Sequence, residues 1–106
     1  MYSAMEIAKY IINKCTKEKH PISNLQLQKI LYYIQKTFLD CGDIAFFEDF
    51  EAWQFGPVVR EVYNFYCGFG GMPITMKYDI DISLDYTNII NPIIEEKKRK
   101  RTLDSI

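Results

Sequence analysis

The sequence lacks any run of apolar residues that could cross a bilayer, for which about 20 consecutive apolar residues are needed. Its N-terminus also lacks the basic region, apolar stretch and small-residue cleavage site of a secretory leader. We therefore expect a cytoplasmic protein that makes no membrane contact.

Cysteine and histidine are both scarce. Cys15, Cys41 and Cys67 are far apart in the sequence, and the single histidine, His20, cannot complete a zinc site with them at any usual spacing. We expect the cysteines to be reduced and buried, and His20 to lie in an exposed link before Pro21. The sequence therefore offers no metal site, no cofactor site and no paired nucleophile and base.

Glycine and acidic residues are present but not in catalytic patterns. The segment 68–71 (Gly-Phe-Gly-Gly) has neither the G-x-G-x-x-G spacing nor the Lys-Ser/Thr of a phosphate loop, so we interpret it as a flexible link. The acidic pairs at 48–49, 79/81 and 95–96 occur where turns, exposed strand faces and helix starts usually place carboxylates. These patterns indicate a protein that is not an enzyme.

A strong net charge is also missing, because the formal net charge is −1. One basic run, Lys97–Arg101, stands out against this balance. We interpret it as a solvated helix face or tail, and two alternatives are a nucleic-acid contact and a docking site for an acidic partner. No second basic stripe with interleaved aromatic residues accompanies it, so nucleic acid is the less favoured partner.

The composition that is present is globular. The chain has 106 residues, of which 48% are hydrophobic and 25% are charged, and these values fit one folded domain. Eight Tyr and seven Phe bring the aromatic content to 15%. Aromatic residues can fill a core, and tyrosine also suits an interface because its hydroxyl can remain hydrated.

Two N-terminal helices are predicted by the same local pattern. Ser3 and Ser23 are each followed three residues later by Glu or Gln, which is a capping box, and helically spaced apolar residues follow both. The first helix is expected over Ala4–Lys17, and the second is expected to end near Gly42. A short link with a proline joins them, so they should pack antiparallel.

The pattern beyond Ile44 is mixed. We expect short extended runs at 44–47 and 50–55, with a strand ending at Gly56 and a helix beginning at Pro57 and continuing to about Cys67. Strict alternation over Ile74–Leu84 predicts either a strand or an extended segment lying over the helices. Asn91-Pro92 resembles the start of a last helix.

The single tryptophan lies among other aromatic residues. Trp53 has two interpretations: a core residue packed on two helices, or part of an aromatic patch at an interface. In the second interpretation polar residues with long side chains surround the patch. The group consists of Trp53, Phe55, Tyr32, Tyr33, Tyr63 and Tyr66, with Lys29, Gln35, Gln54 and Arg60 around it.

Two segments carry a resemblance to a known family. The first is Ile22-Ser-Asn-Leu-Gln-Leu-Gln-Lys-Ile-Leu-Tyr-Tyr-Ile-Gln35, and the second is Glu51-Ala-Trp-Gln-Phe-Gly-Pro-Val-Val-Arg-Glu-Val-Tyr63. They resemble the Panacea domain, also described as a phage-associated, GepA-like or SocA-like domain, and the resemblance covers about Met5 to Tyr66. Family members usually carry a further C-terminal segment, with a Thr-His and a Pro-Trp pair, that we expect this chain to lack.

The resemblance implies a fold, a function and a partner. It implies a single domain over residues 1–106 that is mainly α (α+β), with about four helices and a small β-hairpin or extended element. It also implies an antitoxin, typical of prophages and mobile elements, that neutralises a cognate toxin encoded by an adjacent gene through direct binding. Homo-oligomerisation stays open. The candidate partner-binding residues are Lys29, Tyr32, Trp53, Gln54, Phe55, Gly56, Pro57, Arg60 and Tyr63.

Two other function classes stay open at the level of sequence. The chain could be a prophage-encoded adaptor or regulator that binds a host protein, delivers a partner to a protease, or binds nucleic acid through Lys97–Arg101. It could also be a hydrolase or nuclease, which would need a cluster of histidine or acidic residues that we do not find.

Overall fold

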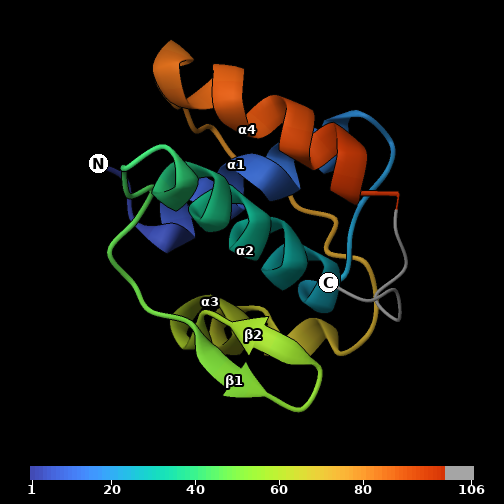
Figure 1. Ribbon diagram of the computed structural model, residues 1–106. Helices are drawn as coiled ribbons and strands as arrows, with labels where there is room; N and C mark the ends of the chain where they lie inside the picture. The colour runs from blue at the N-terminus through green and yellow to red at the C-terminus, as the bar shows by residue number, and fades with distance from the viewer. Residues whose placement is uncertain (100–106) are drawn as a thin grey trace.

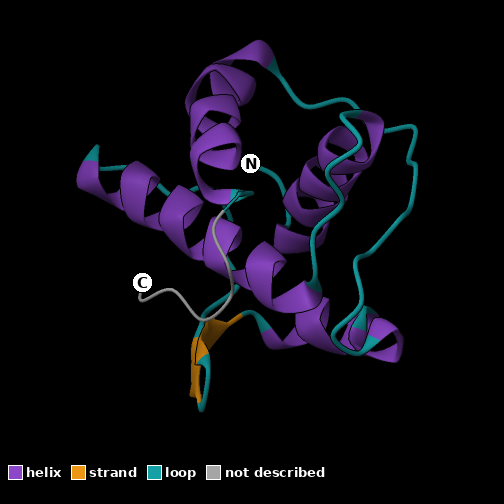
Figure 2. Cartoon of the chain, turned by 90° about the vertical axis from the view of Figure 1, so that its right-hand side faces the viewer, coloured by secondary structure: helices purple, strands orange, loops and turns teal. Residues whose placement is uncertain are grey.

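Residues 1–99 fold as four α-helices and one β-hairpin, with helix α2 at the centre. The computed structural model describes residues 1–99. Helix α2 contacts α1, α4 and strand β2, so it lies between α4 on one side and the hairpin on the other (Figure 1). Figure 2 shows the hairpin projecting from the helical body. The elements are α1 (Ala4–Lys17), α2 (Asn24–Asp40), β1 (Glu51–Trp53), β2 (Gly56–Val58), α3 (Arg60–Phe65), a 3-10 turn (Cys67–Phe69) and α4 (Leu84–Lys97).

The first two helices confirm the prediction from their capping boxes. The Ser3 and Ser23 hydroxyls accept hydrogen bonds from the backbone N–H of Glu6 and Gln26, whose side chains accept from the N–H of the two serines in return. The predicted bounds of α1 are correct. Helix α2 ends at Asp40, and Gly42 follows its C-cap residue, Cys41. Gly42 has a φ of 78°, which glycine adopts at little cost.

The core lies between α1, α2 and the segments that cross them. The apolar stripe predicted for α1 is fully buried, and the apolar face of α2 is buried except for Cys41. Cys67 is exposed as well, so the prediction that all three cysteines are buried was wrong for two of them. Burial raises the pKa of the Cys15 thiol to about 11, which keeps it protonated at neutral pH.

The prediction for Gly56-Pro57 was wrong. These residues do not open a helix; with Val58 they form β2, which pairs antiparallel with β1 in the register Glu51–Val58, Ala52–Pro57 and Trp53–Gly56. Helix α3 begins only at Arg60. Proline is tolerated both at the first position of a helix and at a strand edge, so the local sequence could not distinguish them. The run 44–47 forms no strand, and 68–69 belong to the 3-10 turn rather than to a free link.

Two further predictions concern the C-terminal part. Of the two alternatives for the alternating segment, a strand or an extended segment, the second is correct. Residues 74–83 form an extended chain over the helices, with one β-bridge from Ile74 to Ile22. Helix α4 begins at Leu84, so Asn91 is not its cap and Pro92 lies inside it. Tyr10 donates a hydrogen bond of 2.7 Å to Asn91, which attaches the middle of α4 to α1.

The end of α4 is attached to the end of α1 by ion pairs. The Lys98 side chain is 4% exposed, and its Nζ lies 2.6 Å from Glu18 and 3.0 Å from Glu95. Lys14 Nζ lies 2.6 Å from the other carboxylate oxygen of Glu18. Burial raises the pKa of Glu18, but the hydrogen bonds from Lys14 and Lys98 outweigh burial and lower it to about 2.

This cluster predicts a loss of stability in acid. The pKa of Glu18 lies below its ordinary value of 4.5, so its contribution is present above about pH 4.5 and disappears as the pH falls towards 2. We expect Glu18→Gln to lower the melting temperature at pH 7 and the difference from the unaltered protein to shrink between pH 4.5 and pH 2. Thermal unfolding followed by circular dichroism measures this difference.

The matched control is Glu61→Gln, which removes the same charge from an exposed position on α3. Its melting temperature should follow that of the unaltered protein across the range. A Glu18→Gln difference that stays constant from pH 7 to pH 2 would contradict the assigned role of the carboxylate.

Candidate partner-binding surface

The tip of the hairpin is held by one carboxylate. Trp53 Nε1 donates a hydrogen bond of 3.1 Å to Glu51 Oε1, and Arg60 Nε lies 2.8 Å from Glu51 Oε2. The hydrogen bond from Trp53, followed by the interactions with Arg60, lowers the pKa of Glu51 against the opposing effect of desolvation. The Trp53 ring also packs edge-on against Tyr63, with 4.9 Å between centroids. Glu51 was not among the predicted binding residues, although its carboxylate fixes the orientation of Trp53.

Two amides on α2 hold the hairpin and α3 in place. Gln28 Oε1 accepts a hydrogen bond of 2.8 Å from the backbone N–H of Val59, and its Nε2 donates to Asn24 Oδ1. Asn24 Nδ2 in turn donates to the carbonyl of Tyr63 at 3.0 Å. Asn24 and Gln28 are buried and lie one helical turn apart, so both point to the same chain segment. The two sequence segments that resemble the Panacea domain are therefore hydrogen-bonded to each other.

A third amide on α2 holds the loop that leads into the hairpin. Gln35 Oε1 accepts from the N–H of Ala45 at 2.8 Å, and Gln35 Nε2 donates to the carbonyl of Phe46 at 2.6 Å. Both bonds satisfy backbone groups of a segment that has no regular structure of its own. These amides of α2 thus determine where the chain enters and leaves the hairpin.

The candidate residues around the hairpin tip are mostly accessible. Phe55 is 66% exposed and Trp53 is 37% exposed, which is high for such large apolar side chains. Lys29 is 5% exposed, so it does not contribute to the accessible surface, contrary to the sequence-based expectation. Of the other candidates, Gln54 and Arg60 are exposed, whereas Tyr32, Gly56, Pro57 and Tyr63 are half-buried.

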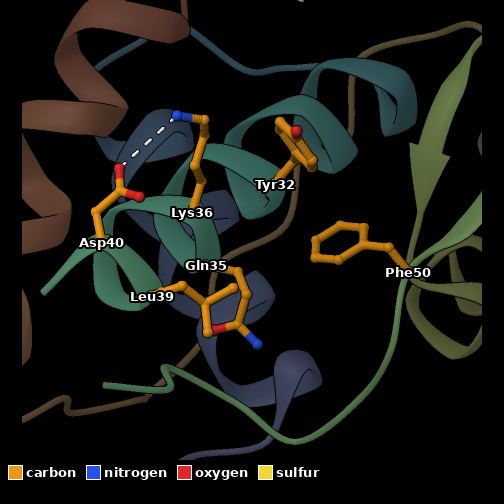
Figure 3. Close-up of a pocket in the computed structure, with 6 residues that line it drawn as sticks. All are labelled: Tyr32, Gln35, Lys36, Leu39, Asp40 and Phe50. Atoms are coloured by element: carbon orange, nitrogen blue, oxygen red, sulfur yellow. Dashed lines mark ion pairs between the residues drawn. The ribbon is translucent and has the colours of Figure 1, made fainter. Parts of the chain in front are cut away.

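A shallow groove lies beside α2 on the way to the hairpin (Figure 3). Its volume is about 190 Å³, and the rings of Tyr32 and Phe50 meet edge-on at 5.7 Å. Leu39, which also lines the groove, is 56% exposed, and the side chains of Lys36 and Asp40 form an ion pair of 3.7 Å. Phe50 directly precedes β1, so the groove and the hairpin are continuous along the chain.

The aromatic residues predicted as one group divide into four environments. Trp53, Phe55 and Tyr63 gather at the hairpin, and Tyr32 lines the groove. Tyr66 is buried in the core, where burial and a hydrogen bond with Tyr78 raise its pKa. The ring of Tyr33 lies 4.0 Å from Lys97 Nζ. The core interpretation therefore holds for Tyr66, whereas Trp53 and Phe55 are exposed, as a surface patch requires.

The acidic pairs do not converge on a site. Glu48 accepts a hydrogen bond from the N–H of Ala4 at the start of α1, and Glu95 pairs with Lys98, so each has a structural partner. Within residues 1–99, no three His, Cys, Asp or Glu side chains lie together as a metal site requires. None of the described helices is long and apolar enough to span a membrane.

The basic run is only partly a surface feature. Lys98 is buried in the ion pairs with Glu18 and Glu95, so the prediction of a solvated face was wrong for this residue. Lys97 pairs with Glu96 at 3.5 Å. Positions 100–101 of the run lie outside the described residues. The described lysines of the run are therefore engaged within the fold.

Comparisons with known proteins identify what the chain is similar to. The family described as "Antitoxin SocA-like, Panacea domain" matches residues 27–104, which is well over half of the chain. "Antitoxin SocA" of Caulobacter vibrioides (strain NA1000 / CB15N) is 44% identical over 62 residues. This alignment covers 58% of the chain and 33% of the relative, so it spans about a third of the relative's length. No solved structure matches the chain.

Proposed function

Because this chain belongs to the Antitoxin SocA-like, Panacea domain family, we propose that it is an antitoxin that neutralises a cognate toxin by binding it directly. The toxin is proposed to be the product of a neighbouring gene, and the activity requires no chemical step by the antitoxin. The 44% identity to a protein named "Antitoxin SocA" supports this proposal.

The observation that carries the binding mode is the exposed aromatic tip of the hairpin. Tryptophan, tyrosine and arginine supply most of the binding energy at protein interfaces, and Trp53, Tyr63 and Arg60 lie together here. Glu51 and Gln28 accept hydrogen bonds from Trp53 and Val59, and Asn24 donates one to Tyr63. These bonds hold the surface in one conformation before binding, which lowers the entropy lost on association. We propose that the contact residues are Tyr32, Trp53, Gln54, Phe55, Gly56, Pro57, Arg60 and Tyr63.

The proposal predicts that one exposed side chain is required for neutralisation. We expect the unaltered protein to restore growth when it is co-expressed with the toxic product of the neighbouring gene, and to elute with it in gel filtration. Phe55→Ser should weaken the complex by at least about tenfold, since it removes a large apolar side chain that a partner would bury. Growth rescue and a titration followed by calorimetry provide the two measurements.

The matched control is Leu84→Ser, because Leu84 is 71% exposed at the start of α4, across α2 from the hairpin (Figure 1). It should leave both rescue and affinity unchanged. If the unaltered protein neither rescues growth nor forms a complex, the proposed function is wrong. If Phe55→Ser binds as well as Leu84→Ser, only the assignment to the hairpin is wrong.

A further inference from the structure

The hairpin has one covered edge and one open edge. The sheet contains only β1 and β2 within the described chain, and β2 also packs against α2. Figure 1 shows β2 between α2 and β1, so the outer edge of β1 faces away from the helical body. An uncovered strand edge presents backbone N–H and C=O groups that a further strand can pair with.

The register determines which backbone groups lie on that edge. Ala52 faces Pro57, and proline has no N–H to give to an antiparallel pair. The pair Ala52–Pro57 is therefore the non-hydrogen-bonded kind, in which the backbone groups of both residues point away from the partner strand. Pro57 therefore has no N–H on the outer edge of β2, whereas Ala52 presents both its N–H and its C=O on the outer edge of β1.

These groups of Ala52 have no partner elsewhere in the described chain. No hydrogen bond joins the backbone of Ala52 to another element among residues 1–99, and the residue is exposed. Its methyl side chain leaves room for a second backbone to approach at strand spacing. The edge is thus chemically complementary to an extended polypeptide rather than to a helix, whose backbone groups are already paired.

The surroundings of this edge connect it to the proposed toxin-binding surface. Trp53 follows Ala52 and is fixed by Glu51, and Phe50 precedes β1 and lines the groove on α2. Successive residues of a strand point to opposite faces of the sheet. A strand added to β1 would therefore have Trp53 beside it on one face of the sheet and Phe50 near it on the other. A backbone edge flanked by fixed aromatic side chains supplies both affinity and side chain preference.

We propose that the outer edge of β1 receives an extended segment of the toxin, which pairs with Ala52 through backbone hydrogen bonds. This inference rests on the proposed function and specifies how the partner is held. The segment contributes its own unpaired N–H and C=O groups, and its apolar side chains contact Trp53 and Phe50.

The test uses the full chain and the product of the neighbouring gene, purified as a complex after co-expression. Ala52→Pro removes the N–H on the open edge and places the proline ring where the partner strand would lie, without removing a hydrogen bond between β1 and β2. We expect the complex to weaken by at least about tenfold, since a backbone hydrogen bond is lost and the approach is blocked. Asp79→Pro places a proline in another exposed extended segment and serves as the control.

A second measurement uses the unaltered protein, so it remains valid even if Ala52→Pro destabilises the fold. Amide exchange of the unaltered protein, resolved by NMR, should show the N–H of Ala52 exchanging at least about tenfold more slowly in the complex than in the free protein. An unchanged exchange rate, or an affinity of Ala52→Pro within twofold of the Asp79→Pro control, overturns the inference while leaving the proposed function intact.

Two other outcomes identify different occupants or a different function. If the unaltered protein is a dimer by light scattering and Ala52→Pro is a monomer, the edge pairs with a second copy and the inference is overturned. If no complex forms with the neighbouring gene product at all, the proposed function fails, and this inference fails with it.

Discussion

Replacing Phe46 by alanine is expected to lower the free energy of unfolding by about 3–5 kcal/mol. Phe46 is fully buried, its ring lies 5.9 Å from that of Phe50, and its carbonyl accepts the hydrogen bond from Gln35. Removing the ring therefore leaves a cavity beneath the loop that enters the hairpin. Urea denaturation followed by circular dichroism measures the change.

The adjacent residue provides a matched control. Phe47 is 75% exposed, so Phe47→Ala removes the same atoms from water rather than from the core and should change the free energy by no more than about 0.5 kcal/mol. Equal losses for the two substitutions would contradict the burial pattern of this loop. Phe46 and Phe47 are adjacent and chemically identical, so the local sequence does not distinguish them. A difference in stability between the two variants therefore tests the tertiary structure directly.

Replacing Gln28 by leucine is the second substitution with a large expected effect. Leucine has a similar volume but leaves the N–H of Val59 and the Oδ1 of Asn24 without their partner in a buried position. Each buried polar group left unpaired costs about 1–3 kcal/mol, so we expect a loss of about 2–4 kcal/mol in the free energy of unfolding. Urea denaturation measures it, and a shift in Trp53 fluorescence reports whether the hairpin has moved.

The control for Gln28 is Gln54→Leu, which makes the same chemical change at an exposed position of the hairpin tip. Its effect on the free energy of unfolding should stay within about 0.5 kcal/mol. If Gln28→Leu is as stable as Gln54→Leu, the amide does not hold α3, and the account of how the two family segments are joined is wrong.

Three amide side chains of α2 hold in place the second of the two segments that resemble the family and the loop that precedes it. Asn24, Gln28 and Gln35 were visible in the sequence, but their periodicity predicted only a helix that contained them. The structure shows that all three satisfy backbone groups of the chain from Ala45 to Tyr63. Nothing in a single sequence reveals which backbone groups distant in the chain a side chain amide will meet.

The helical part of the fold could be predicted from local chemistry. Capping boxes and apolar periodicity act within four or five residues, and they placed the start of α1 at Ala4 and the cap of α2 at Ser23. The prediction of a mainly helical domain with a small hairpin is confirmed. The start of α4 was missed because Asn91-Pro92 imitates a helix start, whereas the actual cap position, Ser83, forms no side chain cap.

Several features of the candidate surface could not be predicted. Lys29 belongs to a segment that resembles the family, yet it is buried, whereas Glu51 was not selected and holds both Trp53 and Arg60. Lys98 looked like part of a basic tail and instead neutralises Glu18 and Glu95. Burial and pairing of charges depend on which elements meet, and that information is not local.

By itself, the sequence determined the first two helices, the apolar stripe of α1 and the resemblance to an antitoxin family, because these depend on short-range spacing and on recognisable segments. Only the tertiary structure decided that Gly56-Pro57 is a strand, that Pro57 and Ala52 face each other, and that no strand within residues 1–99 pairs with the outer edge of β1. The physical reason is that proline restricts φ equally well in a helix start and in a strand edge. The packing of β2 against α2 and its pairing with β1 select the strand.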